Sequence, residues 1–253
     1  MHEAETDEPG LTTITGARRR SGSRARGRLA DEVHDMLLGQ LMSLRIVPGS
    51  RVTIDALSRE LGVSQTPIRD ALNRMEADGL LVRVPHAGYR IPPQITRARF
   101  EDMLETRLLL EPAAARRAAQ FASKEDIAGL RVLLEDMAQV EGRDDHLPHE
   151  SYGAFGLLDA AFHDLVARSG GNMLIQEMLA RLHTHVHLFR LHYDTQVTFL
   201  AMGEHEAVIA GIADRDPEAA SYAMRHHILL SGERFRTLFD QAAASPRDQG
   251  LDA

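Results

Sequence analysis

The sequence predicts a mostly α-helical protein with a small N-terminal domain and a larger, all-α bundle behind it. Three observations support this fold class. Apolar residues recur at three- and four-residue steps along most of the chain, which is typical of amphipathic helices. Two β-rich pieces occur together, within residues 80–91. Gly- and Pro-containing breaks separate the helical stretches.

The first helices of the small domain follow from this periodicity. A helix is predicted from residue 29 to about 44, and "VPGS" at 47–50 ends it. Thr53 is expected to cap a second, short helix, which Gly62 ends in a left-handed turn. Ser64 is expected to cap a third helix. The stripe of the first helix and the buried face of the third consist of apolar residues: Leu29, Val33, Met36, Leu37, Leu41 and Leu44, then Ile68, Leu72 and Met75.

A β-hairpin is predicted directly after the third helix. Residues 80–84 and 89–91 are β-rich and flank a turn at 86–88. Pro92-Pro93 then ends a domain that spans residues 28–93. Its pattern is therefore helix, helix-turn-helix, hairpin.

The larger domain, residues 97–240, contains no convincing alternating strand. Six stretches carry helical periodicity: 97–120, 124–141, 151–168, 172–193, 198–214 and 217–240. They predict an all-α helical bundle. Two terminal segments lie outside both domains. Residues 1–27 are poor in apolar side chains and Arg-rich at their end, which predicts a disordered basic arm, and residues 241–253 are expected to form a flexible tail.

Charge is distributed unevenly between the two domains. Residues 18–93 carry 13 Arg against 8 Asp and Glu, whereas residues 94–253 carry 16 Lys and Arg against 25 Asp and Glu. This asymmetry suggests that only the first region faces a polyanion such as DNA. No run approaches 18 apolar residues, the acidic N-terminus lacks the apolar core of a secretory signal, and there is no cysteine. We therefore expect no membrane span and a cytoplasmic location.

The start of the third helix is rich in polar side chains of the kind that can pair with DNA bases. Ser64, Gln65, Thr66 and Arg69 form a polar first turn and a half. A helix in the major groove meets base edges with its N-terminal residues, where Gln can pair with adenine and Arg with guanine. The alternative is an ordinary helical hairpin with a polar cap. The following hairpin and the local positive charge favour the DNA-binding interpretation.

These residues also resemble a known family. The run "PGSRV…LSRELGVSQTPIRDALNRMEADGLLVRVPHAGYRI" is similar to the winged helix-turn-helix domain of GntR-type bacterial transcription regulators, over residues 28–92. The FadR-like branch of that family carries an all-α ligand-sensing domain, FCD, which the helical region 97–240 fits. Where family members usually have a basic residue, this chain has Gln65, so its operator sequence is expected to differ. The resemblance implies DNA contacts by Arg51, Ser64, Gln65, Thr66, Arg69 and the wing around Gly88, and phosphate contacts by Arg74 and Arg90.

The acidic half contains candidate metal ligands. Asp159 and His163 lie four residues apart on one helical face, and His205 and His227 lie on two further helices. Three imidazoles and one carboxylate would suit Zn²⁺, and also Ni²⁺, Mn²⁺ or Fe²⁺. Spacing alone is a weak signal, because an Asp–His pair at this spacing is often a surface hydrogen bond. The resemblance to metal-binding FCD domains, carried by "DxxxH … EH … DPEAA … MRxH", implies Asp159, His163, His205 and His227 as the ligand set.

Two further groups are open to more than one interpretation. Arg107, in "LETRLLLEP", resembles a residue of the first sensor helix and is a candidate for holding an anionic effector. Its alternative is a salt bridge to Glu111 at i+4. The run "HTHVHLFRLH" contains His183, His185, His187 and His192. We expect these histidines to line a cavity or the surface, in preference to forming a second metal site.

Together these features predict a metabolite-responsive transcription regulator that is not an enzyme. It is expected to bind a palindromic operator in double-stranded DNA as a homodimer, because two recognition helices must meet two half-sites. A small organic acid at a metal-containing pocket is the expected effector. The alternatives are a hydrolase dependent on an Asp/His₃ metal site, or an interaction module with a structural metal. No general acid or base stands out beside the proposed ligands, and Ser64–Arg69 would have no role in either alternative.

Overall fold

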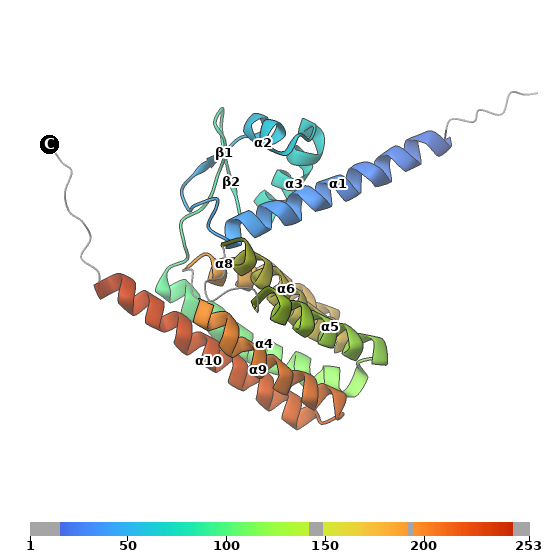
Figure 1. The fold of residues 1–253 in the computed structure, drawn as a ribbon, viewed down its shortest axis with the longest axis vertical. Helices are drawn as coiled ribbons and strands as arrows, with labels where there is room; N and C mark the ends of the chain where they lie inside the picture. Colours follow the sequence, from blue (N-terminus) through green and yellow to red (C-terminus); the bar gives the residue numbers. More distant parts are fainter. Residues whose placement is uncertain (1–15, 142–148, 192–194, 245–253) are drawn as a thin grey trace, which may run out of the picture.

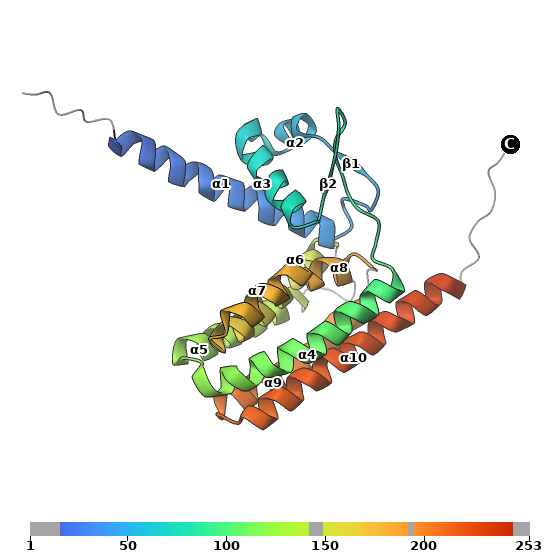
Figure 2. The same ribbon diagram turned by 180° about the vertical axis from the view of Figure 1, so that it is seen from behind.

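The computed structural model describes residues 16–141, 149–191 and 195–244, which form two lobes (Figures 1 and 2). The small lobe contains the three N-terminal helices and the hairpin, and the large lobe contains the remaining helices. The mostly α-helical fold class is confirmed. The elements of the small lobe are α1 (Gly16–Met42), β1 (Arg51–Val52), α2 (Ile54–Leu61), α3 (Gln65–Ala77), β2 (Val82–Val84) and β3 (Gly88–Arg90).

The small lobe has the predicted helix-turn-helix. The hydroxyl of Thr53 accepts a hydrogen bond from the N–H of Ala56 at 3.2 Å, and Gly62 ends α2 with φ of 64°. Ser64 occupies the N-cap position of α3, but its side chain makes no capping hydrogen bond, so that part of the prediction is wrong. The predicted stripe of α1 is only partly correct, because Met36 is 46% exposed and Leu44 lies beyond the end of α1. The core contains other residues of that stripe, the predicted face of α3 and residues at the wing: Val33, Leu37, Leu41, Ile68, Leu72, Met75, Leu80 and Tyr89.

The wing is a three-stranded antiparallel sheet in the order β1-β3-β2. Strand β2 is shorter than predicted, and β3 has the predicted length but lies one residue earlier. Strand β1 was not predicted because two residues carry no detectable alternation. Gly88 opens β3 with φ of +86°, and a Cβ there would lie 2.7 Å from the carbonyl oxygen of Val52. Glycine is therefore required where β3 passes closest to β1.

The first helix begins earlier than expected. Residues 16–27 belonged to the predicted disordered arm, yet α1 starts at Gly16. Ala and Arg favour helix, and adding residues to a helix that is already formed is far easier than starting one. The rest of the arm, residues 1–15, and most of the tail, residues 245–253, lie outside the described residues; 241–244 extend the last helix.

The large lobe is an all-α bundle. Its helices are α4 (Arg97–Phe121), α5 (Lys124–Glu141), α6 (His149–Ser169), α7 (Met173–Leu182), α8 (Thr184–Phe189), α9 (Thr195–Ala213) and α10 (Pro217–Ala244). The single helix predicted over 172–193 is interrupted at His183, whose φ of 45° separates α7 from α8. In both views α4, α9 and α10 run side by side, with α5, α6 and α7 on the other side of the bundle (Figures 1 and 2). Among the described helices, none combines the length and apolarity needed to cross a membrane.

Close contacts join the two lobes. The C-terminal part of α1 packs on α6 and α8, and a Cβ at Gly153 of α6 would lie 2.7 Å from the carbonyl oxygen of Gly39 of α1. The linker after the wing is also held, because Arg190, just 1% exposed, donates Nη2 to the carbonyl of Pro92 at 2.8 Å. The region around α8 therefore contacts both the first helix and the linker of the small lobe.

Candidate nucleic-acid interface and metal centre

The start of α3 presents its polar side chains outward. Ser64, Gln65, Thr66 and Arg69 are all exposed, whereas Ile68 on the same helix is fully buried. Because Ser64 makes no capping bond, its hydroxyl and the N–H groups of the first turn can accept and donate to another molecule. This arrangement suits an anionic partner at the helix N-terminus.

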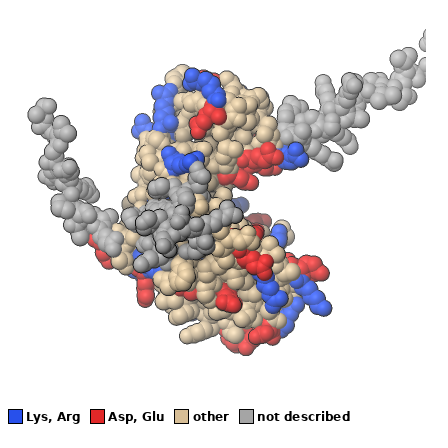
Figure 3. Space-filling model, viewed as in Figure 1, with Lys and Arg blue, Asp and Glu red and all other residues tan. Residues whose placement is uncertain are grey.

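The wing extends this basic surface. Arg69 lines a groove between α3 and the hairpin, together with Arg83, His86 and Gly88. The sequence interpretation did not include Arg83 and His86 among the candidate DNA contacts. A basic residue beside a predicted hairpin turn could have indicated them. In Figure 3, Lys and Arg atoms gather along the edge of the small lobe that carries the hairpin. The groove and this edge form one positively charged surface.

Two other predicted contacts lie on the sheet. Arg51 in β1 is directly opposite Arg90 in β3, and both side chains are exposed. Arg51 donates Nε to the carbonyl of Ala87, in the turn next to Gly88. Arg51 and Arg90 therefore lie side by side on the wing, and Arg51 also holds the turn that precedes Gly88.

Two predicted contacts are bonded to the protein itself. Gln65 donates Nε2 to Oδ1 of Asp55 at 2.8 Å, in an exposed hydrogen bond that a base edge can replace. Arg74 has its Nη1 2.6 Å from Oδ1 of Asp31 on α1. Arg74 is thus engaged with the first helix, which makes it a weaker candidate for a phosphate contact than the other seven residues.

The four predicted metal ligands come together inside the large lobe. Asp159 and His163 lie on α6, His205 on α9 and His227 on α10, and all four are buried. Nε2 of His205 lies 3.2 Å from Oδ1 of Asp159, and Nε2 of His163 lies 3.2 Å from Nε2 of His227. Atoms bonded to one Zn²⁺ at about 2.0–2.1 Å cannot be more than about 4.2 Å apart. Each of these two separations fits a shared ion. The donor atoms form two overlapping sets within 4.8 Å of one another, His163 with His205 and His227, and Asp159 with His163 and His185.

Two carboxylates, the buried Glu111 and the partly buried Glu204, fix which nitrogen of each outer histidine faces the centre. Glu111 on α4 contacts Nδ1 of His163, and Glu204 on α9 lies 2.8 Å from Nδ1 of His227. A carboxylate accepts a hydrogen bond there, so the proton of each neutral ring sits on Nδ1 and the lone pair on Nε2. Two lone pairs then face each other across 3.2 Å, an arrangement that a cation stabilises.

Several buried atoms at the centre have no hydrogen-bond partner among the described residues. They are Oδ1 of Asp159, both ring nitrogens of His205 and Nε2 of His185. The contact between His205 and Asp159 is close in distance but lacks hydrogen-bonding geometry. Leaving buried polar atoms unpaired is costly, so the donor set is one that a divalent ion would complete.

The protonation states also suit a cation. Burial lowers the pKa of His205, and it lowers the pKa of His227 to about 3. Burial acts to raise the pKa of Asp159, but the histidines around it hold that pKa well below its usual range. At neutral pH the cluster therefore offers a neutral imidazole at His227 and a carboxylate at Asp159, which are the forms that bind a metal.

His185 is a fifth polar side chain at this centre. Its Nε2 lies 3.5 Å from Oδ2 of Asp159, and its side chain is 11% exposed. The sequence interpretation expected it to line a cavity, and it does line one that reaches the cluster. Its place beside Asp159 was not predicted, because the break at His183 reorients α8.

Arg107 forms the salt bridge considered as its alternative. It is 2% exposed and donates Nε to Glu111, whose other oxygen contacts Nδ1 of His163. Burial acts to raise the pKa of Glu111, but Arg107 and His163 hold it well below its usual range. Nη2 of Arg107 has no hydrogen-bond partner in the described part of the chain. Arg107 therefore positions Glu111 and keeps one free N–H group near the cluster.

The sequence and fold match characterised protein families. The model of the FCD domain matches residues 102–230, and that of the bacterial regulatory proteins of the gntR family matches 29–91. The Nta operon transcriptional regulator of Aminobacter aminovorans is 28% identical over 186 residues, covering 73% of this chain and 84% of that protein. The Bacillus subtilis HTH-type transcriptional regulator YcbG is 26% identical over 212 residues, 78% and 83% of the two chains. The solved structure of E. coli McbR/YncC has a TM-score of 0.67 at 21% identity, covering 85% and 98%.

Proposed function

The chain belongs to the GntR family of bacterial regulatory proteins and carries an FCD domain, and from this premise we propose how it senses and responds. It is a transcription regulator and not an enzyme, as its relatives are. We propose that it binds a palindromic operator as a homodimer. A small carboxylate bound beside a divalent metal ion, most favourably Zn²⁺, changes its affinity for that operator.

The metal proposal rests on the buried donor set of the large lobe. Asp159, His163, His205 and His227 converge from three helices, with unpaired donor atoms and with Nε2 of two rings turned inward. The metal, when bound, supplies a positive charge with coordination positions that a carboxylate can fill. Arg107, with its free Nη2, supports recognition of an anion at the same place.

The DNA proposal rests on the exposed start of α3 and the wing. Gln65 and Arg69 are proposed to contact bases, with Ser64 and Thr66 beside them. Arg51, Gly88 and Arg90 are proposed to hold the wing against the backbone. A homodimer follows from geometry, since each chain carries one recognition helix and a palindromic site has two half-sites.

Selection of bound fragments from the source genome, followed by operator titration, tests this proposal. Binding should be specific for one palindrome and should weaken steeply with salt, because phosphate contacts release counterions. Gln65→Arg should change the preferred bases in a randomised-operator selection while binding persists. Binding to any duplex without preference would overturn the operator assignment.

The sensor half is tested on the same protein. Elemental analysis of the purified full chain should find about one divalent ion per chain, and small carboxylates should shift operator affinity when that ion is present. A chain that carries no metal at saturating zinc, or one that no carboxylate affects, would overturn the sensor assignment.

A further inference from the structure

A cavity of about 230 Å³ lies between the two lobes, directly beside the metal cluster. Its inner end is formed by His163, His185 and Glu111, which belong to the cluster or hold it. The rest of the cavity extends between α6, α7 and α8 towards α1. We call this space the shared chamber. Its inner end therefore meets the proposed ligand position.

The wall of the shared chamber opposite the cluster comes from the DNA-binding lobe. Leu38 and Met42 of α1 line it, facing Leu157 of α6, Leu179 of α7 and Val186 of α8. These are apolar side chains with no hydrogen-bonding group. The chamber is thus polar where the histidines lie and where Asp164 and Gln176 hydrogen-bond to each other, and apolar along the wall formed by these five side chains. A ligand that matches it has an acidic head and an apolar tail.

The chamber is also attached to the end of the recognition helix. His183, which lines the chamber and has φ of 45°, places Nε2 3.9 Å from Oδ1 of Asp78. Asp78 is the C-cap residue of α3. Two separate parts of the small lobe therefore reach the chamber. Leu38 and Met42 of α1 line it directly, and Asp78 at the end of α3 contacts His183 in its wall.

We propose that the shared chamber binds the apolar tail of a small carboxylate whose head lies at the His163–His185 end, so that one ligand contacts both lobes. This inference rests on the proposed function, because it assumes an acid at the metal centre. Liquid water occupies about 30 Å³ per molecule, so the chamber offers room for roughly eight non-hydrogen atoms. The ligand class is therefore a straight or lightly branched acid of about four to six carbons, whose two carboxylate oxygens complete the count.

Contact with α1 links ligand binding to DNA binding. A ligand changes an equilibrium only if it binds one arrangement better than another. Leu38 and Met42 belong to α1, which packs both on α3 of the DNA-binding lobe and on α6 and α8. A tail that packs on them would therefore bind with a different affinity to any arrangement in which α1 sits differently on the large lobe. Linkage is reciprocal, so operator DNA must change the affinity for the acid by the same factor.

A chain-length series tests the chamber. The zinc-loaded full chain is titrated calorimetrically with the straight-chain acids from acetate to octanoate, with and without operator DNA. Each methylene buried in the chamber should tighten binding about fourfold until the space is filled. Equal affinity for all members that bind would overturn the shared chamber while leaving the carboxylate site in place. No binding by any member would instead overturn the proposed carboxylate effector.

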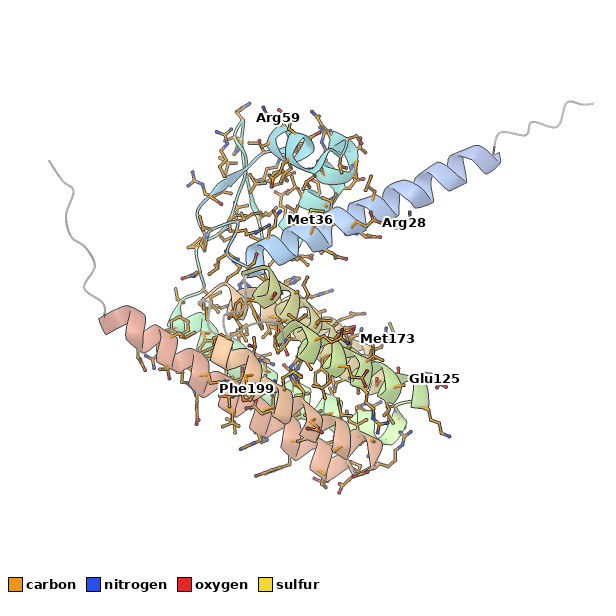
Figure 4. The ribbon with its side chains drawn as sticks, in the orientation of Figure 1. Arg28, Met36, Arg59, Glu125, Met173 and Phe199 are labelled. Carbon is orange, nitrogen blue, oxygen red and sulfur yellow. The ribbon has the colours of Figure 1, made fainter. Side chains whose placement is uncertain are left out.

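Variants on α1 locate the tail. Leu38→Ala should flatten the increase with chain length and leave acetate binding unchanged. Met36→Ala is the matched control, because Met36 lies on the same helix, is 46% exposed and does not line the chamber (Figure 4). If both variants keep the full chain-length dependence, the tail does not lie against α1 and the proposal fails.

A filling variant provides a second, independent measurement. Ala180 of α7 lines the chamber and is exposed, so Ala180→Leu should be tolerated and should narrow the space. Octanoate should then bind more weakly than in the wild type by at least tenfold, with acetate unchanged. Unchanged octanoate affinity in Ala180→Leu would also overturn the proposal, even if Leu38→Ala proved too unstable to measure.

Discussion

The recognition surface and the metal cluster are both groups of polar side chains poised for a partner, but they are built in opposite ways. Ser64, Gln65, Thr66 and Arg69 come from one helix and are exposed to water. Asp159, His163, His205 and His227 come from three helices and are buried. Water satisfies the first group when no DNA is bound. Nothing comparable satisfies the second, so its unpaired atoms are the stronger evidence for an occupant.

The two groups also differ in how their side chains are held. On the recognition surface, Gln65 is restrained by one exposed hydrogen bond to Asp55. In the cluster, Glu204 holds the ring of His227 and is itself gripped by both terminal nitrogens of Arg234, at 2.6 and 2.9 Å. The comparison indicates that substitutions on the recognition surface should each reduce DNA binding independently and additively. Substitutions in the cluster should instead reduce metal binding and effector binding together.

The largest expected effect is the loss of a metal ligand. His227→Ala should weaken zinc binding by more than about 100-fold and abolish the effector response, since replacing even a residue that supports a ligand costs about 10–100-fold. Operator affinity should stay within about tenfold, because the winged helix lies in the other lobe. The measurements are elemental analysis and operator titration with and without effector.

The neighbouring residue provides the control for this substitution. His226 is exposed on α10, and its ring stacks on Tyr222 away from the cluster. His226→Ala should keep the metal and the response. A metal-free His227→Ala protein that still responds normally to effector would show that the ion is purely structural.

A smaller loss of zinc affinity is expected when a residue that supports a metal ligand is replaced. Glu204→Gln keeps the size of the side chain but removes the charge that holds Nδ1 of His227 and pairs with Arg234. Zinc affinity should fall about 10–100-fold. Glu206→Gln, at an exposed position of the same helix, should leave it unchanged. Equal zinc affinity in both variants would mean that the carboxylate does not orient the ligand.

The recognition surface should show a loss of similar or smaller size, confined to DNA binding. Arg69→Ala should weaken specific operator binding by about 1–3 kcal/mol, the contribution of a bidentate base contact. Zinc content and folding should not change, because the side chain is exposed. Arg131→Ala, at an exposed position of α5 in the other lobe, is the control for the loss of one positive charge. If both variants bind the operator equally, Arg69 contacts no base.

Lowering the pH should weaken zinc binding by the buried cluster less than it would weaken zinc binding by exposed histidines. At pH 5.5, an ordinary imidazole with a pKa of about 6.5 would cost about tenfold in metal affinity per ligand. Burial lowers the pKa of His227 to about 3, so this ring stays neutral there, and burial acts in the same direction on the pKa of His205. Zinc affinity should therefore fall less than about tenfold between pH 7.5 and 5.5, measured with a competing chelator. A fall of a hundredfold or more would contradict the buried, neutral rings.

The same lowered pKa has a defined effect on folding. An unfolded histidine binds its proton near pH 6.5, whereas the folded one does not until near pH 3. The unfolded state therefore binds more protons between these values, and the metal-free protein loses stability as the pH falls through that window. Denaturant unfolding of the metal-free chain at pH 7.5 and 5.5 would reveal this sign, and greater stability at pH 5.5 would contradict it.

The smallest effect is expected at Arg74. Its ion pair with Asp31 is largely exposed, and such pairs contribute about 0–1 kcal/mol. Arg74→Ala should therefore change operator affinity by less than about tenfold and stability by less than about 1 kcal/mol. A larger loss of affinity, with a reduced salt dependence, would place Arg74 on the DNA phosphates instead.

Much of the small lobe follows from its sequence. The cap at Thr53, the left-handed Gly62 and the apolar face of α3 are local properties of a few neighbouring residues. The polar first turn of α3 is equally local. Such features depend on backbone dihedral preferences and side-chain periodicity, which act within one or two helical turns.

The metal ligands were identified differently. The spacing of Asp159 and His163 showed that they share a helical face, but the set of four rested on resemblance to a family. The structure brings those four side chains together and adds Glu111 and Glu204, from α4 and α9, behind the rings. Glu111 had appeared merely as an alternative partner for Arg107. No pattern in one helix reports what a side chain on another helix contacts.

The sequence by itself therefore determined the positions of most helices, the cap at Thr53, the outward-facing recognition residues and the separation of basic and acidic halves. Tertiary structure alone decided that α8 breaks from α7 at His183, that His185 reaches Asp159, and that α1 closes a chamber beside the cluster. The physical reason is range. Hydrogen bonds and periodicity specify structure along a few residues, whereas the positions of His185 and Leu38 are fixed by packing between helices that are far apart in the chain.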